Sequence, residues 1–347
     1  MDRDRMDAMA EATALTRAGR LAEATALIRR TVSGAPSAMH HRPPAAPDRG
    51  LPESPDSPES PDDIALPAGP ALPGETTART HRGVAGARPY LLHVPATGTG
   101  LRPLVVLLHG GTQTAAEIAT ATRIRELAEE HGLLVVCPEQ PTSANSMRYW
   151  NWFQPGDQRR GAGEPAILAG IVDDVAAAHE VDRDRVYVAG FSAGAAMAAV
   201  LGATHPDVFA AVGVHSGLPH GCAHDVASAF AAMRETAPAA PLRRPVPVIV
   251  FHGDADPTVA ADNAPRVVEQ FTGGPVRGDT VVERGPGRPA TRTVVRRDGV
   301  VVAEQWTVHG SGHAWSGGVA GGPYTDPAGP DASAAMLRFF AEHPRRS

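Results

Sequence analysis

The chain has 347 residues, of which 42% are hydrophobic, 20% charged and 5% aromatic, and its formal net charge is −6. This length is enough for a substantial core, and the acidic balance argues against a nucleic-acid-binding protein or one held on an acidic membrane surface.

No apolar run approaches the roughly 20 residues that span a bilayer. Two cysteines cannot form a disulfide framework or a four-thiolate zinc site. The charged first seven residues lack the apolar stretch of a secretory signal. The sequence therefore predicts a cytoplasmic protein, with non-standard export or a missing upstream signal left open.

The chain opens with a short repeat, because the sequence AEATAL occupies residues 10–15 and again residues 22–27. Both copies consist of good helix formers, and Gly19 and Arg20 between them are typical of a turn. We expect a helical hairpin over residues 1–32. Two copies are too few for a helical solenoid. The hairpin is interpreted as packing on the main domain or on another subunit, with docking to a partner or an insoluble surface as the alternative.

A proline-rich segment follows from residue 33 to residue 79. Eleven of the 33 prolines of the chain lie between Pro36 and Pro73, and apolar side chains are few. Such a composition does not offset the entropy lost on ordering, so we expect an extended, disordered linker that acts as a spacer. The main domain is placed at residues 80–347.

Short apolar runs then alternate with helical segments. We predict strands at Arg88–Pro95 (an outer strand), Leu104–Leu108, Leu133–Cys137, Arg185–Ala189, Ala210–Val214 and Val246–Phe251, and helices near Ile118–His131, Gly163–His179 and Ala193–Leu201. Runs of β-branched residues without polar alternation are typical of parallel strands that are covered on both faces. The pattern predicts a three-layer, doubly wound α/β domain with a mostly parallel sheet. Further on, Asp298 and Gly299 indicate a hairpin between two strands, Thr291–Arg297 and Val300–Val308. A loop over residues 309–330 and a helix over residues 331–343 close the chain.

The strongest chemical signal is the sequence GFSAG at residues 190–194. The pentapeptide alone is weak evidence in a glycine-rich chain, but here it follows a buried strand and opens a helix of small residues. That context is typical of a nucleophile elbow, the turn that presents the catalytic serine in α/β-hydrolases. Ser192 is therefore the candidate nucleophile, and an ordinary turn before a helix is the alternative.

A nucleophilic serine needs a histidine base and an acid that orients it, and in α/β-hydrolases the order along the chain is Ser, Asp or Glu, His. Two aspartates follow the strand that ends at Phe251. Asp256 is preferred because it lies further into the loop, where Pro257 holds the backbone extended, and Asp254 remains the alternative. No His/Cys cluster with ligand spacing accompanies them, so we expect neither a metal nor a cofactor.

Three histidines lie downstream of this acid. His313 is the candidate base because it lies in a glycine-rich loop directly after a strand. His309 is expected at the end of that strand, and His343 at the end of an exposed helix.

An oxyanion hole requires two backbone N–H groups that face the tetrahedral intermediate. We expect one from Ala193, and the other from Gly111 or Thr112 in the loop after an early strand. Three tryptophans lie near these loops, either in the sequence or in the predicted fold: Trp150, Trp152 and Trp315. They predict an apolar surface that binds an acyl group or a polymer, with core packing of Trp152 an equal alternative.

Several segments together resemble the PHB (poly-3-hydroxybutyrate) depolymerase family of esterases, which is related to feruloyl and acetylxylan esterases. They are LHGGTQ at residues 108–113, YWNWF at 149–153, GEP at 163–165, GFSAG at 190–194, HGDAD at 252–256 and GSGHAWSGG at 310–318. The resemblance covers about residues 88–340. It implies an α/β-hydrolase fold with Ser192 as nucleophile, Asp256 as acid and His313 as base.

The sequence departs from secreted polymer-degrading members of that family in three respects. Some relatives carry a cysteine where Gly111 stands, no signal peptide is visible, and no C-terminal polymer-adsorbing domain follows the last helix. Activity on short-chain esters or amorphous polyester is therefore expected in preference to activity on crystalline polymer. We expect Cys137, in a buried strand, and Cys222, in a loop, to be unbridged.

The function that follows is a serine carboxylic-ester hydrolase. It would cleave short-chain hydroxyalkanoate polyester, its oligomers or related esters through an acyl-enzyme. The alternatives are a feruloyl or acetylxylan-type esterase, then a peptidase or an acyltransferase and, from another class, a catalytically silent binding protein of the same fold. The N-terminal hairpin is a candidate for contact with polyester granules or with another subunit.

Overall fold

The computed structural model describes residues 64–345 except 237–238, 240–241, 276–277 and 284–286. The predicted hairpin at residues 1–32 and most of the predicted linker lie outside the described residues. The described residues belong to one compact unit, residues 61–347.

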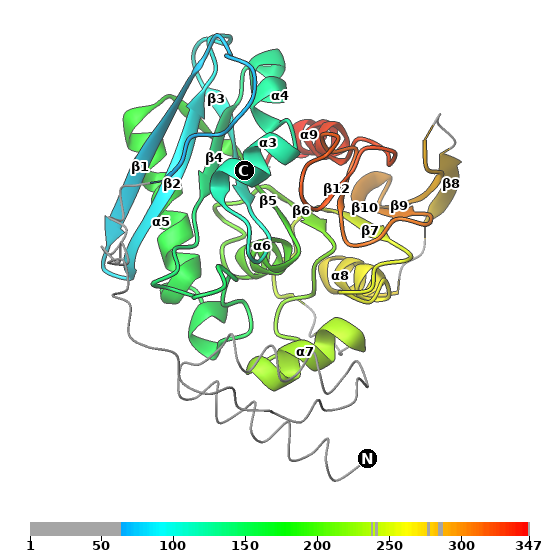
Figure 1. Ribbon diagram of the computed structural model, residues 1–347. Coiled ribbons are helices and arrows are strands. Elements are labelled where there is room, and N and C mark those ends of the chain that lie inside the picture. Colours follow the sequence, from blue (N-terminus) through cyan, green and yellow to red (C-terminus); the bar gives the residue numbers. More distant parts are fainter. Residues whose placement is uncertain (1–63, 237–238, 240–241, 276–277, 284–286, 346–347) are drawn as a thin grey trace, which may run out of the picture. The chain divides into compact units, whose positions relative to one another are not determined.

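A ten-stranded sheet runs through this unit in the order β1-β2-β4-β3-β5-β6-β7-β10-β9-β8 (Figure 1). The six central strands, from β4 to β10, are parallel, whereas the two strands at each edge pair antiparallel. Their bounds are β1 Glu75–Gly83, β2 Gly86–Val94, β3 Arg102–Leu108, β4 Leu134–Pro138, β5 Val181–Phe191, β6 Ala211–His215, β7 Val248–Gly253, β8 Asp279–Glu283, β9 Ala290–Arg297 and β10 Val300–Val308.

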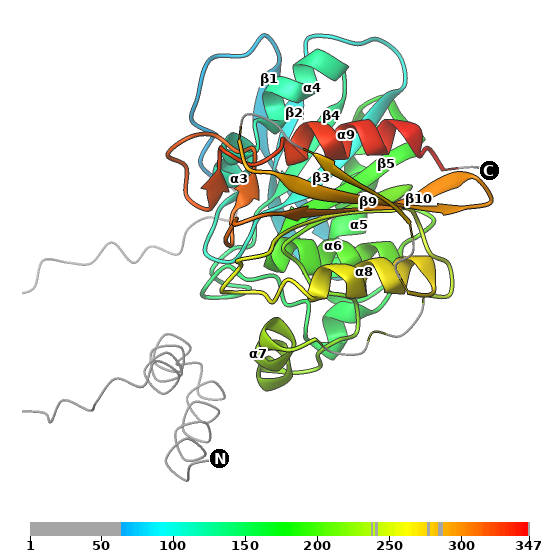
Figure 2. The same cartoon turned by 90° about the vertical axis from the view of Figure 1, so that its right-hand side faces the viewer.

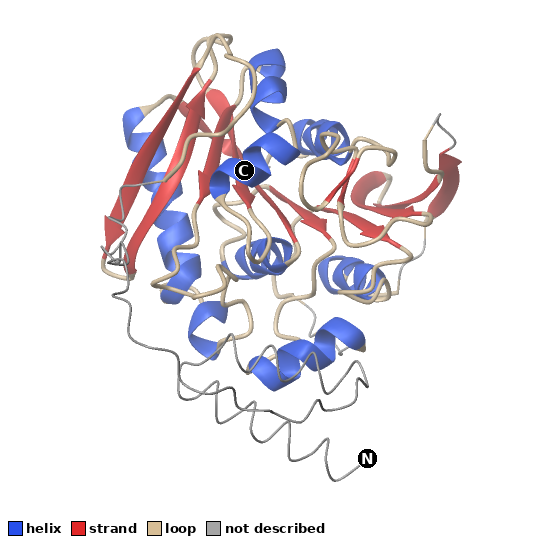
Figure 3. Ribbon diagram, viewed as in Figure 1, coloured by secondary structure: helices blue, strands red, loops and turns tan. Residues whose placement is uncertain are grey.

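Helices cover both faces of the sheet, which makes three layers (Figures 2 and 3). Helices α3 (Ala115–Ala121), α4 (Ile124–His131) and α9 (Ala332–Glu342) pack on one face, and α5 (Gly163–Ala178), α6 (Ala193–Thr204) and α8 (Asn263–Thr272) on the other. A further helix, α7 (Val226–Arg234), and a 3-10 turn (Pro155–Gln158) lie on the side of α5, α6 and α8.

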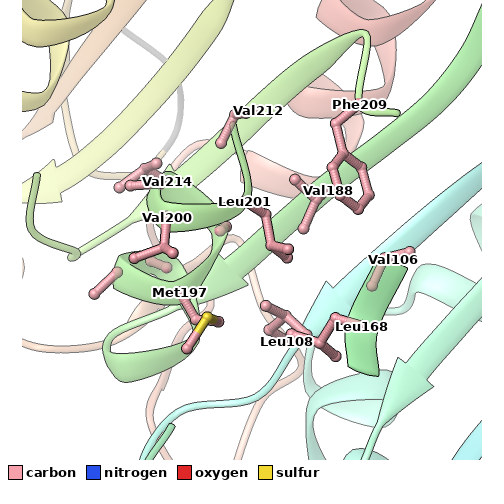
Figure 4. Packing of buried hydrophobic residues seen from close by; sticks show 14 of the residues in the cluster. Val106, Leu108, Leu168, Val188, Met197, Val200, Leu201, Phe209, Val212 and Val214 are labelled. Atoms are coloured by element: carbon pink, nitrogen blue, oxygen red, sulfur yellow. The ribbon is translucent and has the colours of Figure 1, made fainter. Parts of the chain in front are cut away.

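The core between the sheet and α6 explains why the sequences of the central strands are continuously apolar. Val188 of β5 lies next to Leu201 of the helix and Val214 of β6 next to Val200, and all four side chains are buried (Figure 4). Because the opposite face of the same strands is covered by α3, α4 and α9, no polar alternation is left along them. The predicted doubly wound α/β fold is confirmed.

Three differences from the sequence-based prediction concern the edges of the sheet. Arg88–Pro95 is not the outer strand, because β1 pairs with β2 along its whole length, from Glu75 opposite Val94 to Gly83 opposite Gly86. Strand β1 also includes residues 75–79, which the sequence analysis assigns to the linker. Its threonines are β-branched and suit a half-buried strand, and the proline spacing ends at Pro73. Strand β8 and helices α7 and α8 were not predicted.

The short sheet formed by β11 (Trp315–Ser316) and β12 (Thr325–Asp326) ties down the long loop between β10 and α9. Cys137 is buried in β4 and Cys222 is half-buried in a loop, and both are free, as expected. None of the helices within the described ranges is long and apolar enough to cross a bilayer.

Candidate active site

Ser192 sits at the sharp turn between β5 and α6, with φ 54° and ψ −117°. A Cβ at Gly190 would lie 2.4 Å from the backbone of Gly194, and a Cβ at Gly194 would lie 2.4 Å from the carbonyl oxygens of Leu108 and His109. Only glycine fits at either position. The close packing of these backbones therefore holds Ser192 in a strained conformation, as a nucleophile elbow does.

Gly194→Ala is expected to destabilise the domain, because its Cβ would meet backbone atoms that cannot turn away. Overpacking of this kind costs about 1–3 kcal/mol, so the melting temperature should fall by several degrees. Thermal unfolding followed by circular dichroism measures this. Gly156→Ala is the matched control, because a Cβ there meets nothing within 4 Å. Equal melting temperatures of the two variants would contradict the packing argument.

The structure brings Ser192, His313 and Asp256 together in one hydrogen-bonded chain. His313 Nε2 lies 2.9 Å from Ser192 Oγ, and His313 Nδ1 lies 2.7 Å from Asp256 Oδ2. With the Nδ1–H donated to the carboxylate, Nε2 is left to accept the serine proton. The arrangement can deprotonate Ser192 as it attacks an electrophilic carbon.

The side chain of Asp256 is buried and accepts hydrogen bonds on both oxygens. The N–H groups of Thr258 and Val259 donate to Oδ1 at 2.8 and 2.9 Å, while His252 Nε2 lies 3.4 Å from Oδ2. Burial raises the pKa of Asp256, but the hydrogen bonds from His252, His313 and Val259 and the charge of His313 outweigh it. They hold the pKa of Asp256 well below its usual range. The group facing His313 is therefore a carboxylate.

Asp254, the alternative acid, has different partners. Its Oδ2 lies 2.8 Å from His309 Nδ1, and its Oδ1 accepts the N–H of Gly310 at 2.7 Å. The second nitrogen of His309 lies 2.8 Å from Thr291 Oγ1. Asp254 thus braces the beginning of the loop that carries His313, at the surface.

The oxyanion-hole prediction needs one correction. Ala193 is the first residue of α6, so its N–H has no acceptor inside the helix. Thr112, in contrast, donates its N–H to the carbonyl of Met147 at 2.9 Å and is not available. Of the two candidates in this loop, Gly111 is left, since its N–H has no partner in the described part of the chain. A Cβ on Gly111 would lie 2.2 Å from the ring of Tyr149, so any side chain at this position would have to displace that ring.

The loop before α3 is held in place by a buried histidine. His109 donates from Nδ1 to the carbonyl of Gly110 at 2.7 Å and accepts the N–H of Gln140 on Nε2 at 3.0 Å. Burial lowers the pKa of His109 to about 4, so the ring is neutral at neutral pH, as this pair of bonds requires. Trp150 Nε1–H donates to the carbonyl of His109 at 3.0 Å. The loop that carries Gly111 is therefore fixed before any substrate arrives.

The prediction that Trp150, Trp152 and Trp315 form a binding surface is wrong. All three side chains are buried. The indole N–H of Trp150 donates to the carbonyl of His109, and that of Trp315 donates to Ser333 Oγ at 3.0 Å, so both hydrogen bonds lie inside the protein. Their large apolar rings are stabilised in the core. They support the loops of the site and do not face a substrate.

Buried polar residues that the sequence analysis did not interpret anchor the YWNWF segment. Glu164 accepts the N–H and the side-chain amide of Asn151 at 2.8 and 2.9 Å, and it accepts Gln140 Nε2 at 2.6 Å. Arg88 donates to Gln140 and lies 3.6 Å from Glu164. No local sequence pattern identifies a single glutamate after a glycine-rich turn as buried. The only signal for Glu164 was its place in the GEP segment, which is part of the family resemblance.

A strained serine after the fifth strand of a mostly parallel sheet, with an aspartate and a histidine on later loops, defines this protein as an α/β-hydrolase with a Ser–His–Asp constellation. The family model described as "Esterase PHB depolymerase" matches residues 89–294. The chain therefore belongs to the PHB depolymerase family of esterases.

Similar proteins agree with this family. The chain is 40% identical over 237 residues to poly(3-hydroxyalkanoate) depolymerase C of Paucimonas lemoignei, covering 64% of this chain and 57% of that protein. It is 34% identical over 127 residues to feruloyl esterase B of Neurospora crassa, covering 36% and 42%. The chain thus spans about half the length of these relatives. An acetyl xylan esterase from Aspergillus awamori shares the fold, with a TM-score of 0.61 at 20% identity over 78% of this chain and 100% of that one.

Proposed function

We propose that this chain is a serine carboxylic-ester hydrolase that cleaves short-chain hydroxyalkanoate polyester or its oligomers. The observation that carries the proposal is the hydrogen-bonded chain from Ser192 Oγ through His313 to Asp256, on a strained elbow. Membership of the PHB depolymerase family and the 40% identity to a poly(3-hydroxyalkanoate) depolymerase support the substrate class.

The reaction follows from the roles that these atoms can take. Ser192 Oγ attacks the ester carbonyl while His313 Nε2 takes the hydroxyl proton, and the N–H groups of Ala193 and Gly111 stabilise the oxyanion. His313 then gives the proton to the leaving alcohol as the ester C–O bond breaks, which leaves an acyl-enzyme. Water attacks the acyl-enzyme with His313 again as base; the bond from the acyl carbon to Ser192 Oγ then breaks, and His313 returns the proton to Oγ as the acid is released. The carboxylate of Asp256 holds the imidazole in the required tautomer throughout.

The test is acid release from a suspension of amorphous poly-3-hydroxybutyrate, with the Ser192→Ala variant alongside. We expect release that depends on Ser192. If a soluble butyrate ester is cleaved and the polymer is not, the serine mechanism stands and the polyester substrate is wrong.

A feruloyl or acetylxylan-type esterase is the second candidate, because relatives named feruloyl esterase B and acetylxylan esterase A match over 36% and 40% of the chain. Rates on hydroxybutyrate oligomers and on feruloyl esters separate the two candidates. Covalent reaction of Ser192 with a fluorophosphonate probe would argue against a catalytically silent binding protein.

A further inference from the structure

Tyr324 is an exposed aromatic residue at the candidate site that the sequence analysis did not single out. The residue is 46% exposed. The other large apolar side chains that are exposed in the described part of the chain share no ring contact or hydrogen bond with the site. They are Leu66, Val84, Leu101, Val281, Val282 and Val300. The three tryptophans are buried and Tyr149 is half-buried, so Tyr324 is the most exposed of these aromatic side chains near the site.

Tyr324 connects the two loops between which the substrate must lie. Its ring centroid is 6.2 Å from that of Phe191, the residue before the nucleophile, and the Phe191 ring is 4.9 Å from the imidazole of His313. Its hydroxyl oxygen lies 3.3 Å from Thr112 Oγ1, in the loop that carries Gly111. The side chain therefore reaches from the loop of the base to the loop of the oxyanion hole.

The backbone at both ends of this contact is strained. Tyr324 has φ 55° and Thr112 has φ 65°, values that favour glycine over a bulky or β-branched residue. Backbone hydrogen bonds stabilise both conformations. The N–H of Trp315 donates to the carbonyl of Tyr324 at 2.7 Å, and the N–H of Thr112 donates to the carbonyl of Met147. Strain of this kind gathers at functional sites, and Ser192, at φ 54°, is a third case in the same place.

We propose that Tyr324 is a specificity-determining residue that holds the ester unit adjacent to the scissile one. This inference rests on the proposed function. Hydroxyalkanoate chains alternate methyl and methylene groups with carbonyl oxygens. The ring of Tyr324 packs against the apolar groups, and the Tyr324 or Thr112 hydroxyl donates to the neighbouring carbonyl. A short acetate ester has no second unit to make these contacts, so the residue selects oligomers.

The experiment compares Tyr324→Ala and Tyr324→Phe on a 3-hydroxybutyrate trimer and on p-nitrophenyl acetate. We expect Tyr324→Ala to raise KM for the trimer about tenfold, equal to about 1.4 kcal/mol. The change for the acetate should be clearly smaller. Tyr324→Phe keeps the ring and should recover most of the loss on the trimer. Leu101→Ala removes an exposed apolar side chain from the loop before β3. It should leave KM unchanged for both substrates.

A purely structural role is separated by stability. Tyr324→Gly removes the side chain but suits the positive φ, so its melting temperature should not fall while its KM for the trimer rises. Equal losses on both substrates, or a loss for feruloyl esters in place of the trimer, would overturn the role of Tyr324 while leaving a Ser192-dependent esterase. Absence of any Ser192-dependent hydrolysis would overturn the proposed function and this inference together.

Discussion

Ser192→Ala is expected to lower kcat for ester hydrolysis at least about 10⁴-fold. Removing Oγ removes the atom that lies 2.9 Å from His313 Nε2, so no acyl-enzyme can form. The oxyanion donors stay in place and account for the residual rate. The measurement is steady-state hydrolysis of a soluble butyrate ester, with melting temperature as a check on folding.

The chain offers a matched control in Ser216. It is also a buried serine with a positive φ, 53°, at the end of a strand, but it lies next to His215 and not His313. Ser216→Ala should keep most of the activity. If Ser192→Ala hydrolyses the ester as fast as the unchanged protein, Ser192 is not the nucleophile and the proposed function fails.

Asp256→Asn is expected to lower kcat by about 10³–10⁴-fold, whereas Asp254→Asn should cost less than about tenfold. An amide in place of the Asp256 carboxylate carries no charge to stabilise the imidazolium. It can also present an N–H to Nδ1, which would turn His313 to the wrong tautomer. In Asp254→Asn, the amide oxygen of the new side chain can still accept the N–H of Gly310, so the loop that carries His313 would stay braced.

Kinetics of the two variants on the same soluble ester decide between the aspartates. A larger loss for Asp254→Asn would give the role of the acid to Asp254. It would also mean that the loop moves away from the arrangement in which Asp256 Oδ2 lies 2.7 Å from His313 Nδ1.

The class of fold and the loops that carry the reacting groups could be predicted from the amino-acid sequence. Unbroken apolar runs are a local property, and they required strands covered on both faces. Parallel strands bring their carboxyl ends to one edge, so residues just beyond Phe191, Phe251 and Val308 had to converge there. The order Ser, Asp, His in loops after strands selected Ser192, Asp256 and His313, and the parallel sheet explains why these loops meet.

The directions of individual side chains and N–H groups depend on contacts between distant segments, which a local pattern does not contain. The tryptophans lie near the site in sequence, but only the packing of distant segments turns their rings into the core. Thr112 and Gly111 are neighbours in the sequence. The carbonyl of Met147, from a distant segment, accepts the N–H of Thr112, whereas the N–H of Gly111 stays available for the oxyanion. Tyr324 reaches Thr112 across 212 positions of the chain, a contact that no local pattern encodes. A sequence pattern reports which face of an element is apolar, whereas the direction of a side chain in a loop depends on what folds against it.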